Sequence, residues 1–176
     1  MKNKFISKSL LLYIYITLGT LVVISICVAF LSTQQDVHPP DQQFLTANAE
    51  FKKTLNPLQY SVLREGGTEP PYSNREMINN KQKGVYVTAD CGEEVFSSEH
   101  KYDSDTGWPS FWAPINEDAV ILREDNSFGM KRIEVISKKC GSHLGHVFND
   151  GPEPTGKRFC INAAALIFIP DGSKLE

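Results

Sequence analysis

The residues best suited to chemistry lie near the C-terminal end of the chain: Cys160 and the two histidines His143 and His146. A thiolate is a strong nucleophile, and an imidazole can give or take a proton near neutral pH. The histidines stand three apart in HLGHVF, so in a turn around the glycine they could face one cavity. A histidine is more often structural, so an acid–base role, a ligand role and a structural role all stay open.

Two further cysteines, Cys91 and Cys140, are each followed by glycine, as in zinc knuckles. A zinc knuckle needs a second cysteine three residues earlier, but Thr88 and Ser137 occupy those positions. Two thiolates cannot close a tetrahedral zinc site, so a Cys91–Cys140 disulfide is favoured over a bound metal. That pairing leaves Cys160 as a free thiol outside the N-terminal region, which suggests that this cysteine has a chemical role.

Two other features allow more than one interpretation. Cys140 with His143 and His146 forms an alternative ligand set for a metal. Trp108 lies in the aromatic loop GWPSFW, whose rings can belong to the core or form the wall of an apolar site.

The elements that must position these side chains are mostly short strands. Apolar runs separated by turn residues predict strands at 84–88, 94–97, 119–122, 130–136, 147–148, 158–162 and 165–169. This pattern favours an antiparallel β sandwich or barrel-like core. Asn56 and Pro57 predict the start of a helix that carries Leu58, Val62 and Leu63 to the core. A short helix is also expected at 42–53.

The N-terminal region has a different character. Residues 10–31 are apolar and uncharged, long enough as a helix to cross a bilayer, and they follow three lysines. We therefore expect a cytoplasmic basic segment at 1–8, a transmembrane signal anchor at 9–31, a polar linker at 32–53, a catalytic domain at 54–171 outside the cytoplasm, and a tail at 172–176. A cleaved signal peptide is the alternative.

The charge balance excludes one class of partner. The chain has 18 basic and 21 acidic residues, and without the three N-terminal lysines the balance becomes 15 to 21. An acidic domain without a basic cluster argues against nucleic acid as a partner.

The motifs GWPSF, SHLGHVFNDG and RFCIN, in this order, resemble those of the methionine-R-sulfoxide reductases, the MsrB family. The resemblance extends over about residues 55–170. It implies a mainly β fold of two antiparallel sheets with short flanking helices. It also implies a peptide-methionine (R)-S-oxide reductase, which reduces the R epimer of methionine sulfoxide, in proteins or free, to methionine.

The resemblance also assigns roles to individual residues. Cys160 is the nucleophile, His146 the acid–base residue and His143 its support. Asn162 hydrogen-bonds the substrate or a water, and the ring of Trp108 packs on the substrate methyl group.

Two charged residues complete this predicted site. Arg158 is expected to favour the Cys160 thiolate and to contribute to substrate binding, and Glu124 to hold the protonated sulfoxide.

The sequence departs from the family where relatives often carry a resolving cysteine, because Thr106 stands there. We therefore expect an external thiol or a thioredoxin-like protein to reduce the Cys160 sulfenic acid, with recycling through Cys91 or Cys140 as the alternative. Ala163 and Ala165, where relatives often have serine, should alter packing only. No cofactor is expected, zinc included.

Two functional hypotheses follow. The first is a membrane-anchored, monomeric enzyme that repairs oxidised methionine in exported proteins. The second is a catalytically silent module that binds oxidised methionine, although such a module would not need the nucleophile.

Overall fold

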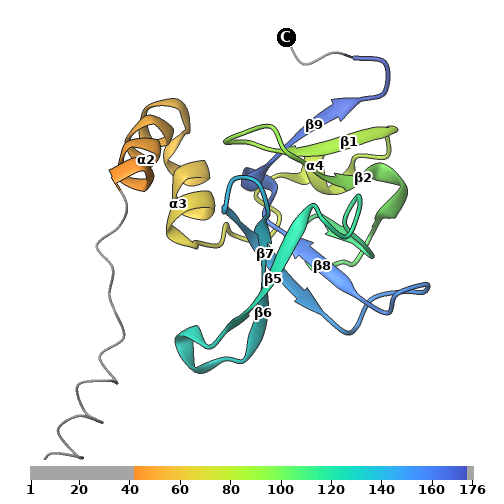
Figure 1. Ribbon diagram of the computed structural model, residues 1–176. Coiled ribbons are helices and arrows are strands. Elements are labelled where there is room, and N and C mark those ends of the chain that lie inside the picture. The colour runs from red at the N-terminus through yellow and green to blue at the C-terminus, as the bar shows by residue number, and fades with distance from the viewer. Residues whose placement is uncertain (1–41, 174–176) are drawn as a thin grey trace, which may run out of the picture. The chain divides into compact units, whose positions relative to one another are not determined.

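The computed structural model describes residues 42–173, which form two β-sheets flanked by short helices (Figure 1). The predicted basic segment 1–8 and membrane anchor 9–31 lie outside the described residues, as do residues 174–176 of the predicted tail. Between residues 42 and 173, no helix has the length and apolar character needed to cross a membrane.

Both sheets of the described chain are antiparallel throughout. The smaller sheet has the strand order β2 (Glu94–Ser97), β1 (Gly84–Thr88), β9 (Leu166–Pro170). The larger has the order β3 (Lys101–Tyr102), β4 (Ser110–Phe111), β8 (Arg158–Ile161), β7 (His143–Phe148), β6 (Arg132–Ser137), β5 (Val120–Asp125). The prediction of a mainly β domain with two antiparallel sheets is confirmed.

The strand boundaries differ from the predicted ones mainly around the histidines. Strands β1 and β2 occupy the predicted residues, whereas β5 continues to Asp125 and β7 already begins at His143. Strands β3 and β4 were not predicted, because a strand of two residues shows no alternation of apolar and polar side chains.

In the described part of the chain, three α-helices flank the sheets: α2 (Gln42–Thr54), α3 (Pro57–Glu65) and α4 (Arg75–Asn79). Helix α3 begins as predicted, because the Asn56 side chain accepts a hydrogen bond from the Gln59 backbone N–H at 2.9 Å. In return, Gln59 Oε1 accepts from the Asn56 N–H at 3.1 Å, which completes a capping box. Gly66, in the left-handed conformation, ends the helix.

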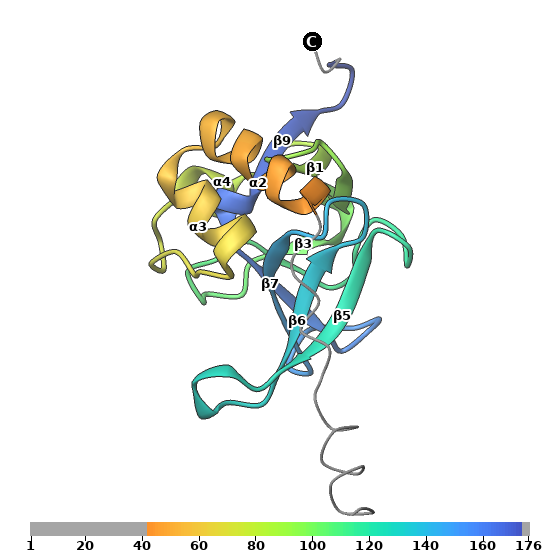
Figure 2. The same ribbon diagram turned by 60° about the vertical axis from the view of Figure 1, so that its left-hand side comes forward.

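Helix α3 packs against β7, near which it lies in Figure 2, and also against the 3₁₀ turn η3 (Ala163–Ala165). Val62 and Leu63 are buried as expected. Leu58 is 43% exposed, so its predicted place in the core was wrong. It lies in the first turn of the helix, which is exposed, and burial increases only toward the second half.

The hydrophobic core joins the two sheets through aromatic rings. Phe96 of β2 stacks on Phe111 of β4 with ring centroids 4.5 Å apart, and Tyr86 of β1 meets the same ring edge-on at 5.0 Å. Phe159 of β8 and Val147 of β7 belong to this core too. Because successive residues of a strand face opposite sides, the neighbours of Phe159 and Val147 face the other side of the larger sheet.

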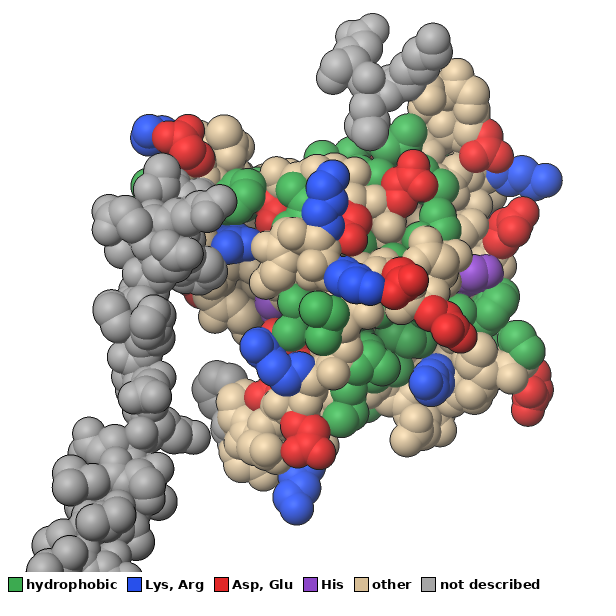
Figure 3. Space-filling model, viewed as in Figure 1, with side chains coloured by type: hydrophobic (Ala, Val, Ile, Leu, Met, Phe, Trp, Pro, Cys, Tyr) green, Lys and Arg blue, Asp and Glu red, His purple; other side chains and the backbone are tan. Residues whose placement is uncertain are grey.

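The surface seen in Figure 3 has a strip of hydrophobic side chains, with acidic and basic side chains scattered around it. Among the described residues, exposed apolar side chains of the outer strands include Leu122 of β5 and Ile133 of β6. Neither sign of charge dominates the described part of this face.

Candidate active site

Cys160 lies near the middle of the larger sheet, on β8. Its register partner on one side is His146 of β7, and on the other side Ser110 of β4. Side chains of directly opposed residues point to the same face of an antiparallel sheet, with Cβ atoms about 4.5–5.5 Å apart. The thiol and the imidazole predicted to work together are therefore neighbours.

His143 reaches the same face through a bulge in β7. Residues three apart in a regular strand point to opposite faces. Here Val135 pairs with Gly145 and Ile136 pairs with His143, so Leu144 is an extra residue, and its side chain is fully buried. The two imidazole rings consequently lie 5.3 Å apart. The expectation that a turn brings the histidines together was wrong, because a bulged strand does so.

Each imidazole is held by a carboxylate. His146 Nε2 lies 2.8 Å from Asp125 Oδ2, which also accepts a hydrogen bond from Arg132 at 2.6 Å. His143 Nδ1 lies 2.8 Å from Glu134 Oε1. Burial lowers the pKa of His146, and the Asp125 carboxylate only partly opposes this. The lowered pKa favours the neutral imidazole, the form that can accept a proton.

The surroundings of Cys160 favour the thiol over the thiolate. Burial raises the pKa of Cys160, whereas the Thr106 hydroxyl, 3.9 Å from Sγ, and the Arg158 guanidinium act in the opposite direction. Arg158 is engaged by both oxygens of Asp150, at 2.9 and 2.8 Å. The expected influence of Arg158 on the thiolate thus has the right direction, but burial outweighs it.

Trp108 and Asn162 are both tied to one buried glutamate, Glu69. The indole Nε1 donates to the Glu69 carbonyl oxygen at 3.2 Å, and Asn162 Oδ1 accepts from the Glu69 N–H at 3.0 Å. The Asn162 amide donates to the carbonyl oxygen of Leu144, the bulge residue, at 3.0 Å. Each polar end of Asn162 therefore has a partner within the protein, so this side chain helps to hold the site together.

These side chains surround a small cavity of about 140 Å³. It is lined by Thr68, Trp108, Arg132, Gly145, His146, Phe148, Cys160 and Asn162. The structure thus brings four predicted site residues into one cavity. Arg158 and His143 are not among the residues that line it, although the His143 ring lies 5.3 Å from that of His146.

Glu124 does not belong to this cavity. Its register partner is Ile133, whereas Asp125 is paired with Arg132. Glu124 is exposed and lines a separate hollow of about 770 Å³ with Ile133 and Val147, which face away from Cys160. The predicted role of Glu124 stays a prediction, but the register of β5 places its neighbour Asp125, and not Glu124, beside His146. Asp125 is the carboxylate at the site.

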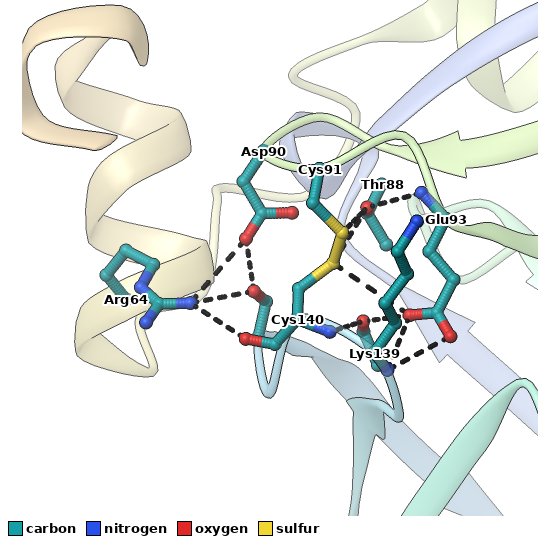
Figure 4. The surroundings of a disulfide bond; sticks show 9 residues. Arg64, Thr88, Asp90, Cys91, Glu93, Lys139 and Cys140 are labelled. Atoms are coloured by element: carbon teal, nitrogen blue, oxygen red, sulfur yellow. Dashed lines mark hydrogen bonds and ion pairs between the residues drawn. A yellow bond between two sulfur atoms is a disulfide. The ribbon is translucent and has the colours of Figure 1, made fainter. Parts of the chain in front are cut away.

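Cys91 and Cys140 form a disulfide that joins the two glycine-containing turns (Figure 4). The Thr88 hydroxyl lies 3.4 and 3.5 Å from the two sulfur atoms. On the other side, the Glu93 carboxylate accepts hydrogen bonds from the Ser137 hydroxyl and from the Lys139 N–H. Thr88 and Ser137 thus take part in a hydrogen-bonded cluster around the sulfurs.

This donor set does not fit a structural zinc ion. Asp90 is the one further ligand-type side chain within 4.8 Å of both sulfurs among the described residues. Its Oδ2 accepts from Ser142, and the Arg64 guanidinium lies 3.6 Å away. A buried guanidinium beside the group would repel a divalent cation. His143, predicted as an alternative ligand with Cys140, is instead held by Glu134.

Sequence reasoning missed three carboxylates of the site: Glu69, Asp125 and Glu134. Each is distant along the chain from the residue it holds, so spacing gave no signal for the contact. Glu69 lies within the residues that resemble the family, but the quoted motifs do not include it.

The arrangement can carry a nucleophilic reaction coupled to a proton transfer. A thiol lies next to a neutral, carboxylate-held imidazole, in a cavity with an indole at its wall. The volume of this cavity suits one substrate side chain rather than the surface of a folded protein.

Comparison with known proteins agrees with this chemistry. The model of the SelR domain matches residues 55–170. The peptide methionine sulfoxide reductase MsrB of Methanosarcina mazei is 58% identical over 122 residues, which make up 69% of this chain and 86% of that protein. The protein of the same name from Leptospira interrogans is 50% identical over 122 residues, 69% and 92% of the two chains. Mitochondrial methionine-R-sulfoxide reductase B3 of Mus musculus is 48% identical over 128 residues, 72% and 50% of the two chains. The chain therefore belongs to the SelR domain family, the methionine-R-sulfoxide reductases.

Proposed function

We propose that this chain reduces the R epimer of methionine sulfoxide, in proteins and as the free amino acid, with Cys160 as its nucleophile. The observation that carries the proposal is the pairing of Cys160 with His146 across β8 and β7, inside a cavity walled by Trp108. The indole offers a flat apolar surface for the substrate methyl group.

The first step transfers oxygen from substrate to enzyme. His146 accepts the proton of the Cys160 thiol, and the thiolate sulfur attacks the sulfoxide sulfur. The same proton passes from His146 to the sulfoxide oxygen, which makes that oxygen a better leaving group. In the resulting adduct the hydroxyl group moves from the substrate sulfur to Cys160 Sγ as the bond between the two sulfurs breaks. Methionine then leaves, and Cys160 carries the oxygen as a sulfenic acid.

The second step needs a thiol from outside the site. Thr106 stands where a resolving cysteine would lie, so an external thiol or a thioredoxin-like protein attacks the sulfenic acid and releases water. A second thiol then reduces the mixed disulfide and restores Cys160. No cofactor takes part in either step, and zinc is not required, because the Cys91–Cys140 disulfide and its hydrogen-bonded cluster join the two turns.

The proposed location is the outer side of a membrane, with residues 9–31 as an uncleaved anchor and the catalytic domain acting as a monomer on exported proteins. The apolar stretch behind Lys2, Lys4 and Lys8 supports this orientation. A structural disulfide also fits an oxidising compartment better than the cytosol.

The test is an assay of the full-length chain with dithiothreitol and a mixture of both sulfoxide epimers, followed by chromatography. Consumption of the R epimer alone, abolished in Cys160→Ser, is the expected result. Loss of neither epimer in a folded chain would favour the silent binding module instead, and full activity of Cys160→Ser would reject the assigned nucleophile.

A further inference from the structure

Three hydroxyl groups form a chain that starts at the sulfur of Cys160. Thr106 Oγ1 lies 3.9 Å from Cys160 Sγ and 2.8 Å from Ser104 Oγ. Ser104 Oγ lies 2.6 Å from Ser110 Oγ, which donates to the backbone carbonyl oxygen of Trp108 at 3.3 Å. Ser110 is almost completely buried, so the far end of the chain is fixed by the protein.

The carbonyl at the far end sets the direction of the chain. Each hydroxyl has one proton to donate, whereas a carbonyl oxygen can only accept. When Ser110 donates to the Trp108 carbonyl, it accepts from Ser104, and Ser104 accepts from Thr106. Thr106 can then only accept from the Cys160 thiol, so this direction suits the protonated form of the cysteine.

Ionisation of Cys160 requires the opposite direction. A thiolate has no proton to donate, so Thr106 must turn its own proton toward the sulfur. Ser104 then donates to Thr106, and Ser110 to Ser104, while the Trp108 carbonyl loses its partner. The hydrogen bond to the charged sulfur is stronger than the neutral bonds that it replaces.

We propose that Thr106 is a further catalytic residue, which donates a hydrogen bond to the Cys160 thiolate, and that Ser104 and Ser110 are positioning residues of a hydroxyl relay that reverses as Cys160 ionises. Ser104 competes with the thiolate for the Thr106 proton. The relay therefore restrains Cys160 through Ser104 and activates it through Thr106. The inference rests on the proposed role of Cys160 as nucleophile.

Other ionisable groups also face Cys160 and must be kept constant in any test. His146 lies opposite it on β7, and Arg158, paired with Asp150, lies two residues before it. Tyr102 of β3 is the register partner of Ser110 on the same row of the sheet. The variants below leave all four groups unchanged.

The experiment measures how fast iodoacetamide alkylates Cys160 in the full-length chain at pH 7, by mass spectrometry of the peptide that contains it. Thr106→Val keeps the shape but loses the hydroxyl, and alkylation should become about tenfold slower, as expected for loss of a hydrogen bond to a charged group. Thr106→Ser keeps the hydroxyl and should react like the unmodified chain. Ser104→Ala removes the competing acceptor, so its rate should equal or exceed that of the unmodified chain.

The matched control is Thr155→Val, which removes a threonine hydroxyl bound to the Trp112 carbonyl and should leave the rate unchanged. Opposite effects at Thr106 and Ser104 distinguish the relay from a structural role, which would lower both rates together. Any of three results would overturn the inference. Thr106→Val could react at an unchanged rate, Thr106→Ser could react slowly, or Ser104→Ala could react as slowly as Thr106→Val. Alkylation needs no sulfoxide, so a failure here is separate from a failure of the proposed reductase activity.

Discussion

Removal of the Glu69 carboxylate should be among the most damaging single changes in this domain. Glu69 is 3% exposed, and its two oxygens accept hydrogen bonds from the backbone N–H groups of Ala163 and Ala164, the latter at 3.1 Å. In Glu69→Ala the buried Ala163 N–H and the partly buried Ala164 N–H both lose their partner.

The size of the effect follows from these two contacts. A hydrogen bond to a charged group contributes about 1.5–3 kcal/mol, so the loss of two predicts about 3–6 kcal/mol of destabilisation. A typical domain has a total stability of about 5–15 kcal/mol. The η3 turn follows directly after Cys160 and Asn162, so the site should loosen before the domain unfolds. Glu69→Gln keeps one acceptor oxygen, so its stability should lie between those of the unmodified chain and Glu69→Ala.

Urea unfolding of the full-length chain, with the disulfide intact and Trp fluorescence as the signal, measures these values. The matched control is Glu94→Ala, an exposed glutamate at the start of β2, which should change stability by less than about 0.5 kcal/mol. If Glu69→Ala were as stable as the control variant, the buried carboxylate would not hold η3 and this reasoning would be refuted.

Three further predictions concern the histidine, the disulfide and the position of the missing resolving cysteine. Because the pKa of His146 is lowered in the folded chain, the unfolded chain binds this proton more readily, so the free energy of unfolding should fall as pH decreases from about 7.5 to 5. Urea unfolding across this range should show a flatter dependence in His146→Gln, and an equal slope would contradict the assignment. Replacing both Cys91 and Cys140 by serine should lower the free energy of unfolding by about 2–4 kcal/mol in the same assay. This variant should still complete multiple turnovers with dithiothreitol. If it completed only one turnover, recycling would pass through this pair of cysteines. Thr106→Cys places a thiol beside Cys160, so non-reducing peptide mapping after one turnover should find a new disulfide to Cys160, and its absence would show that the two positions do not meet.

Local rules predicted much of the fold. The helix start at Asn56 and Pro57 requires only a capping side chain and a residue suited to the first turn, and both lie next to each other in the sequence. Strands β1 and β2 follow from short apolar runs. The motif RFCIN predicted Cys160 as the nucleophile, and the structure places Cys160 opposite His146.

What sequence reasoning missed depends on contacts between distant segments. The choice between Glu124 and Asp125 is decided by a register of one residue, which only the pairing of β5 with β6 fixes. The bulge at Leu144 is stabilised by Asn162, which lies between β8 and η3, so HLGHVF alone does not predict it. Burial around Cys160, which outweighs Arg158, likewise results from packing and not from neighbouring residues.

The central claim is that Cys160 itself takes the oxygen from the substrate and keeps it until an external thiol arrives. The most direct measurement mixes the reduced chain with R-methionine sulfoxide in the absence of any thiol, and adds dimedone to trap sulfenic acid. The account predicts one methionine released per chain and one dimedone adduct, located at Cys160. Methionine release with the label absent from Cys160, or with the oxygen trapped at another cysteine, would contradict it.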